Sequence, residues 1–360
     1  MSEISRLRAG IDLAKGVFQV HGVREEPGEP VVITKRLARS QMEPFLAKLP
    51  PSLIGMEACG SAHYWARIAQ KHGHEVRLIP PAHVKPYVKR NKTDANDAAA
   101  ICEAVSRPTS CRRHASSMMR FVPVKSEAGQ GMLMLHRVRA SFVEKRTAAA
   151  NQLRAMLAEF GVVMPVGERG LSNLLKLVEA RMEAFERLPQ TLRLVLEQLA
   201  LQWRNVDGAV RTMDIEIAAA LKTNMRAKRL RDVPVIGPIG ASAIDALLPN
   251  PQVFRSGRDF AAWVGLTPRE DSSGNTIRRG SITKKGDGYL RRILVLGATA
   301  YLARVRRGDV KGASVWDHRM AVHPKRKLAA VALANKTARI AWAMLAKDED
   351  YHAPARAAAA

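Results

Sequence analysis

Four carboxylates in the first hundred residues have the types and positions needed for metal chemistry. Asp12 interrupts an apolar strand-like segment, and Glu57 ends another. Asp94 and Asp97 share one face of a predicted helix that Thr93 can cap. Burying an acidic side chain costs free energy unless it is paired or metal-bound. Carboxylate oxygens suit Mg²⁺ or Mn²⁺, and two such ions polarise a phosphodiester and activate the attacking oxygen.

Each of these residues also has an ordinary structural explanation. Asp12 is compatible with a turn, and Glu57 with an acidic position at a helix start. Asp94 and Asp97 can simply complement a helix dipole. Their joint order on an alternating pattern of strands and helices is what favours a metal site.

The elements that must position these carboxylates form an α/β pattern over residues 8–105. Apolar alternation predicts a strand pair over 9–23, turning at 14–16, and further strands at 31–37, 53–56 and 75–79. Helices are expected at 41–49, 62–71 and 94–105. The pattern predicts a mixed α/β sheet with the carboxylates converging at one edge.

The charge balance indicates a polyanionic partner. Lys and Arg total 58 against 33 Asp and Glu, a formal net charge of +25. Such a chain repels itself unless a polyanion neutralises it, and nucleic acid is the expected one.

The sequence does not favour a membrane location. The apolar run at 293–303 is shorter than the roughly 20 residues of a membrane span. Three scattered cysteines form no Cys-x-x-Cys pair, so we expect a reducing, cytoplasmic location.

The middle of the chain reads as long helices. One is expected from Glu127 to about Phe160, and a second helical region follows a break at 165–170. The second region carries an apolar seam with alternating steps of four and three for about four heptads. The seam predicts a coiled coil, through self-association or pairing within the chain; a helix packed on its own domain is the alternative. Its members are Leu192, Leu196, Leu199, Trp203, Val206, Val210, Met213, Ile217 and Ala220.

The last third of the chain begins near Leu230 and reads as mainly α. Residues 233–241 resemble the turn of a helix-hairpin-helix, in which Gly237 and Gly240 present backbone N–H groups to a phosphate. Long helices are expected at 289–305 and 327–345. Residues 268–292 hold seven basic side chains against three acids, which suits phosphate contact, although a solvated basic face is an equal alternative. Six of the seven are taken as nucleic-acid-binding candidates: Arg278, Arg279, Lys284, Lys285, Arg291 and Arg292.

The order Asp12, Glu57, Asp94, Asp97 resembles the Asp-Glu-Asp-Asp tetrad of RuvC-like insertion-sequence transposases that carry a second, serine-containing domain. Local strings match as well, among them Gly-Ile-Asp-Leu-Ala-Lys, Gly-Met-Glu-Ala-Cys-Gly, Lys-Thr-Asp-Ala-Asn-Asp-Ala, Leu-His-Arg-Val-Arg and the Ser-Ser-Gly of residues 272–274. The resemblance covers about residues 10–345. It implies a RuvC/RNase H-like domain at 8–125, a helical coiled-coil region at 126–229, a serine transposase domain at 230–346 and a tail at 347–360.

The resemblance also implies a mechanism. The four carboxylates hold Mg²⁺ or Mn²⁺, and a serine of the C-terminal domain attacks a phosphate of double-stranded DNA to form a phosphoserine link. By its place in the motif that serine is Ser273, with Ser272 as the neighbouring alternative; without the resemblance, the segment reads as a plain turn. A structured guide RNA and a homo-oligomer, dimeric or tetrameric, with active sites shared between subunits are further implications.

Two features depart from the family pattern. Val235 stands where the hairpin usually has a glycine, and a β-branched residue resists positive φ. Residues 108–119 read as an insertion. Two other functions are compatible with the charge. One is a RuvC-type junction nuclease that forms no covalent intermediate, but this function gives the serine loop no role. The other is a non-catalytic nucleic-acid-binding protein, but this function gives the four carboxylates no role.

Overall fold

The computed structural model describes residues 7–24, 31–89, 93–107, 119–274 and 276–353. Its contacts divide the chain into two compact units. The first contains the residues up to Gly129, Leu248–Gly286 and Ala338–Glu349; the second contains Gln130–Leu247, Asp287–Thr337 and the residues from Asp350 onward. The 108–119 insertion lies outside the described residues except for Met119.

The N-terminal part of the first unit is a mixed five-stranded sheet in the order β3-β2-β1-β4-β5. Strands β1, β2 and β3 are antiparallel neighbours, while β4 runs parallel to β1 and β5 parallel to β4. The expected mixed α/β sheet is confirmed. The strands are β1 (Arg8–Leu13), β2 (Val17–Arg24), β3 (Val31–Ala38), β4 (Leu53–Glu57) and β5 (Glu75–Ile79).

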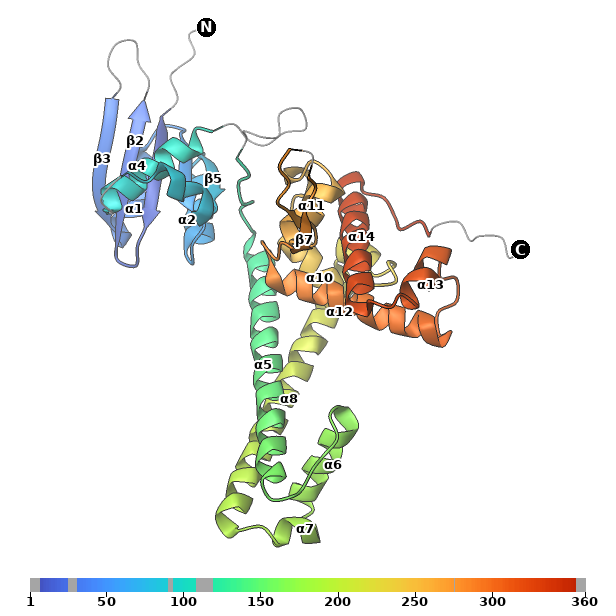
Figure 1. The fold of residues 1–360 in the computed structure, drawn as a ribbon. Helices are drawn as coiled ribbons and strands as arrows, with labels where there is room; N and C mark the ends of the chain where they lie inside the picture. The colour runs from blue at the N-terminus through green and yellow to red at the C-terminus, as the bar shows by residue number, and fades with distance from the viewer. Residues whose placement is uncertain (1–6, 25–30, 90–92, 108–118, 275, 354–360) are drawn as a thin grey trace. The chain divides into compact units, whose positions relative to one another are not determined.

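Helices cover both faces of this sheet (Figure 1). Met42 and Leu46 of α1 and Trp65 of α2 pack with Ile11 and other strand residues in one buried cluster. On the other face Ile101 and Val105 of α4 pack against Ile79. The predicted helices at 62–71 and 94–105 are confirmed to the residue. The helical segments here are α1 (Arg39–Lys48), α2 (Ala62–Lys71), α3 (Pro81–Val84), the 3₁₀ turn η1 (Lys85–Tyr87) and α4 (Asp94–Val105).

The second unit is helical, and its longest elements are α5 (Glu127–Ala158) and α8 (Gln190–Thr223), which lie side by side (Figure 1). The first three residues of α5 belong to the first unit. Two short helices, α6 (Glu168–Glu179) and α7 (Glu183–Glu186), pack at one end of the pair.

Every predicted seam position of α8 is buried or half-buried. Leu196 packs in one cluster with Leu153 and Leu157 of α5 and Leu174 of α6, so much of the seam is covered by helices of the same chain. Packing against α5 and α6 thus explains the first part of the seam, from Leu192 to Trp203. Self-association along this seam stays a prediction.

The remaining elements are short helices, one small hairpin and two longer helices. In the second unit these are α9 (Met225–Leu230), α10 (Pro238–Leu247), α12 (Gly288–Arg307) and α13 (Val315–Ala321). In the first unit they are η2 (Pro251–Val253), α11 (Gly257–Val264), β6 (Pro268–Glu270) and β7 (Arg279–Ile282). The last helix, α14 (Arg326–Lys347), contributes to both units. The prediction of a mostly helical remainder is confirmed. No helix in the described part of the chain combines the length and apolar character needed to cross a bilayer.

Candidate active site

Strand alternation and pairing bring Asp12 and Glu57 to neighbouring strand ends. Strands β1 and β4 pair in parallel with Ile11 opposite Met56, so Asp12 and Glu57 follow at the next step of the register. Successive side chains of a strand point to opposite faces. Asp12 therefore shares a face with Gly10, and Glu57 shares that face with Gly55.

The same face carries α4, which packs directly on the two glycines. A Cβ at Gly10 would overlap the Ala98 carbonyl oxygen and the Cys102 amide nitrogen, and one at Gly55 would press on Val105. Only glycine permits this approach of helix to strand.

The direction of α4 places its first turn toward the carboxylates. Cys102 Sγ lies 3.6 Å from the Arg8 carbonyl oxygen, so the C-terminal half of α4 faces the start of β1. The N-terminal turn, with Asp94 and Asp97, therefore extends toward Asp12 at the other end of the strand. This turn is fixed by Thr93, whose hydroxyl accepts a hydrogen bond from the Asn96 amide at 3.2 Å.

Electrostatics agree with this convergence. The pKa of Asp12 is raised, first by partial burial and then by the negative charges of Asp97, Asp94 and Glu57. A cation bound beside Asp12 would offset these negative charges and favour its ionised form. Among the described residues, no group of three or more His, Cys, Asp and Glu side chains already has metal-holding spacing. The donor set itself consists of hard carboxylate oxygens, the type that suits Mg²⁺ or Mn²⁺.

Ser272 and Ser273 lie in the hairpin between β6 and β7. Ser273 and Thr276 exchange backbone hydrogen bonds of 3.2 and 3.1 Å around a tight turn, in which Gly274 has a φ of +55°. The turn composition noted in the sequence is thus a real turn. The Ser272 hydroxyl donates to Glu270 at 3.2 Å and accepts from the Arg278 amide at 3.3 Å. The exposed Ser273 hydroxyl has no partner among the described residues.

The basic candidates divide between the two units. In the first unit Arg278, Arg279, Lys284 and Lys285 are exposed on the hairpin and the segment after it. In the second unit Arg291 is half-buried on α12, and the exposed Arg292 pairs with Glu144 of α5 at 3.1 Å. The two glycine candidates border α10.

Gly237 is exposed, and a Cβ added to it would meet no atom within 4 Å. Gly240 is buried against Ile236 and Ile293. Val235 does not adopt a positive φ. The turn between α9 and α10 therefore accepts the valine without strain, and its carbonyl oxygen packs against Gly297 of α12.

Sequence reasoning missed two polar clusters in the second unit. One surrounds Asp207 between α5 and α8, and the other surrounds the buried His136. The first left a trace in the sequence: Asp207, Arg211 and Asp214 on α8, and Arg139 and Arg146 on α5, recur at steps of three, four and seven beside the apolar seam.

A mixed sheet with helices on both faces, followed by a mainly helical region, agrees with the RuvC-like domain of a transposase, the class that the family comparisons show. The family description DEDD_Tnp_IS110, a transposase, matches residues 9–162, and the description "Transposase IS116/IS110/IS902 family" matches residues 227–311. The chain belongs to the IS110/IS116 family of insertion-sequence transposases.

Relatives match over nearly the full length. The protein named "Probable family 20 transposase" of Pseudomonas aeruginosa is 44% identical over 345 residues, covering 96% of this chain and 98% of the relative. The transposase for insertion sequence element IS1328 of Yersinia enterocolitica is 38% identical over 92% of this chain and 95% of its own length. The transposase for IS1111A of Coxiella burnetii is 37% identical, with 95% and 90% covered.

Proposed function

We propose that this transposase cuts and rejoins DNA by metal-assisted phosphoryl transfer, with Ser273 as the nucleophile. The observation that carries the proposal is the shared face of Asp12 and Glu57 with α4 and its Asp94 and Asp97. These four residues would hold Mg²⁺ or Mn²⁺. When bound, the ions polarise the phosphodiester and neutralise its developing charge.

The difference between the two serines supports Ser273. Hydrogen bonds on both sides hold the Ser272 hydroxyl within the hairpin, so its nucleophilic oxygen is engaged. The Ser273 side chain is exposed at the turn. In the proposed step a bond forms between Ser273 Oγ and phosphorus, the serine proton passes to a base, and the bond from phosphorus to one deoxyribose oxygen breaks. That oxygen leaves as a hydroxyl after taking up a proton. Attack by another DNA hydroxyl reverses the step, joins the new strands and frees the serine.

The DNA-contacting role is proposed for the exposed Arg278, Arg279, Lys284 and Lys285, with Arg291, Arg292 and the exposed Gly237 as further contacts. Gly240, expected from the sequence to present its N–H group to a phosphate, is buried against Ile236 and Ile293 and is not proposed as a contact. The net charge of +25 supports phosphate binding. Guidance by a structured RNA and a dimeric or tetrameric assembly are proposed from the family resemblance.

The test is a covalent-adduct assay. Protein purified with its copurifying RNA is mixed with labelled junction DNA and Mg²⁺ and run on a denaturing gel. We expect a DNA–protein adduct from the native chain and from Ser272→Ala, and none from Ser273→Ala or Asp12→Asn. Cleavage by Ser273→Ala at the native rate would reject the serine role and favour a junction nuclease. An adduct lost in Ser272→Ala but kept in Ser273→Ala would move the nucleophile by one residue.

A further inference from the structure

A cavity of about 1000 Å³ lies in the second unit, where α5, α8 and the start of α6 border it. Four arginines line it against a single described carboxylate, that of Asp207. Arg204 is paired with Glu179, which lies outside the wall, so Arg146, Arg154 and Arg211 leave a positive excess over Asp207. The arginines are Arg146, Arg154, Arg204 and Arg211.

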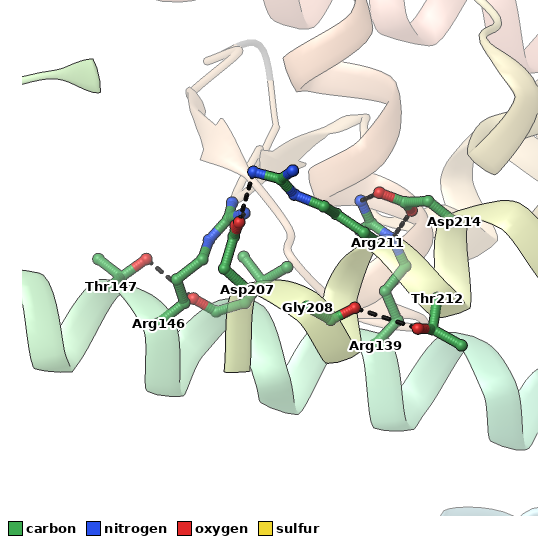
Figure 2. A network of polar contacts seen from close by, with 9 residues as sticks. Arg139, Arg146, Thr147, Asp207, Gly208, Arg211, Thr212 and Asp214 are labelled. Carbon is green, nitrogen blue, oxygen red and sulfur yellow. Dashed lines mark hydrogen bonds and ion pairs between the residues drawn. The ribbon is translucent and has the colours of Figure 1, made fainter. Parts of the chain in front are cut away.

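Asp207 orients two of these arginines without neutralising both (Figure 2). Its side chain is only 9% exposed, and its two oxygens accept from Arg146 at 2.6 Å and from Arg211 at 2.8 Å. A guanidinium has five N–H donors, so each arginine keeps donors for a ligand. The Arg211 side chain is 76% exposed, which leaves those donors accessible. Asp207 is therefore a positioning residue for a pair of anion-binding groups.

Two buried donors in the wall lack acceptors. Trp203 Nε1 and Arg154 Nε are buried with no hydrogen-bond partner among the described residues. Because neither nitrogen is exposed, the two donors cost the wall free energy and are not themselves ligand contacts. Trp203 also offers a ring beside the arginines, and base–aromatic stacking with arginine–phosphate contact is the usual chemistry of single-strand recognition.

The size of the cavity argues for one class of ligand. Small-molecule pockets span about 300–1000 Å³, so this cavity is larger than an isolated phosphate requires. In a double helix the faces of the bases are stacked on one another, so no base face is free to lie against an aromatic ring. The ring of Trp203 instead fits an unstacked base.

We propose that this cavity binds an unpaired nucleotide of a nucleic-acid strand, with its phosphates on Arg146 and Arg211 and its base against Trp203. The site is separate from the carboxylates and does not depend on the cutting reaction. RNA and single-stranded DNA share the required chemistry.

The test is photo-cross-linking of the full-length protein with mapping of the cross-linked peptides. Short single strands carry 4-thiouracil in an RNA arm and 5-bromouracil in a DNA arm, and a duplex of the same sequence forms a third arm. We expect a cross-link to the peptide that contains Trp203 with a single strand and at least five-fold less with the duplex. Competition of the cross-link by unlabelled RNA and by unlabelled single-stranded DNA of the same sequence identifies the preferred polymer.

The chain offers a matched control. Arg211 and Arg187 are exposed to 76% and 75%, and each pairs with a carboxylate four residues earlier, but only Arg211 lines the cavity. Arg211→Gln should lower the Trp203 cross-link about ten-fold, and Arg187→Gln should leave it unchanged. Equal losses would overturn the proposal in favour of non-specific charge.

A cross-link absent from the cavity peptides would also overturn the proposal. The proposal would also be overturned if polyglutamate, but not an unlabelled single strand, abolished the cross-link, since that result would indicate an acidic protein partner. Because no outcome requires DNA cleavage, failure here is distinguishable from failure of the proposed strand transfer.

Discussion

His136 Nδ1 and the Tyr289 phenol oxygen lie 2.9 Å apart, although 153 residues separate them in the sequence. On its other side His136 Nε2 lies 3.0 Å from the Ser242 hydroxyl. Burial raises the pKa of Tyr289, and the nearby charge of Arg139 opposes this rise. Arg139 itself pairs with Asp214 (Figure 2). One buried imidazole thus joins α5, α10 and α12.

His136 should make the stability of the protein fall in mild acid. Burial, followed by the charge of Arg139, lowers the pKa of His136 to about 4. Since the folded pKa lies below the unfolded value near 6.5, the unfolded state takes up the proton first as pH falls. The resulting loss is about 2 kcal/mol between pH 6.5 and 5. Denaturant unfolding at both values should show it, and His136→Gln should lose this pH dependence while exposed His83→Gln keeps it.

Tyr289→Phe should destabilise the second unit by about 1–3 kcal/mol, because it leaves the buried His136 Nδ1 without its hydrogen-bond partner. Ser242→Ala should cost a similar amount. If the two hydroxyls act through one imidazole, the double variant should cost less than the sum of the single ones. Strictly additive losses in urea unfolding would show that the hydroxyls act independently. Tyr64→Phe, at a partly exposed ring in the first unit, serves as the control.

Gly10→Ala should abolish strand transfer and lower the unfolding midpoint of the protein. The added methyl group would strike backbone atoms of α4, which cannot rotate away as a side chain can. Separation of α4 from β1 would then move Asp94 and Asp97 away from Asp12. Gly16→Ala is the matched control, because nothing lies within 4 Å of its would-be Cβ. Native adduct formation by Gly10→Ala would contradict the packing role of this glycine.

Mg²⁺ should raise the thermal unfolding midpoint of the native chain, and EDTA should reverse the gain. The reason is that a cation relieves the mutual repulsion of the four carboxylates. Asp12→Asn removes one of these charges, so we expect it to raise the metal-free midpoint and to reduce the Mg²⁺ response. Asp309→Asn, at an exposed residue paired with Arg307, should leave both unchanged. An equal Mg²⁺ response in Asp12→Asn would exclude Asp12 from ion binding.

Local patterns were sufficient to predict the elements of the N-terminal sheet. The boundaries of α2, β5 and α4 follow from apolar periodicity, turn residues and the Thr93 cap, all of which operate within a few residues. The order of the carboxylates predicted their shared edge for the same reason, since parallel neighbours end together. That the four residues hold metal stays a prediction.

The polar clusters of the second unit could not be predicted in this way. His136 meets Ser242 and Tyr289 from 106 and 153 residues away, and no local pattern encodes such a meeting. The Asp207 cluster could be predicted in part. Its pairing with Arg211 follows from their spacing of four residues on α8, but its pairing with Arg146 of α5 requires the fold. The apolar seam of α8 could be recognised in the sequence. Only the structure shows which helices pack against it.

The parallel pairing of β1 with β4 has a consequence for biosynthesis. Asp12 leaves the ribosome early, but its neighbour Glu57 follows 45 residues later and Asp94 another 37 later. Until α4 has emerged, the nascent sheet has an uncovered face at Gly10 and Gly55, with no side chain to shield the backbone. The acidic edge is therefore completed only after about residue 105. We expect a translation product that ends before residue 94 to be inactive on DNA and sensitive to proteolysis, because it lacks both the covering helix and two of the four acidic residues.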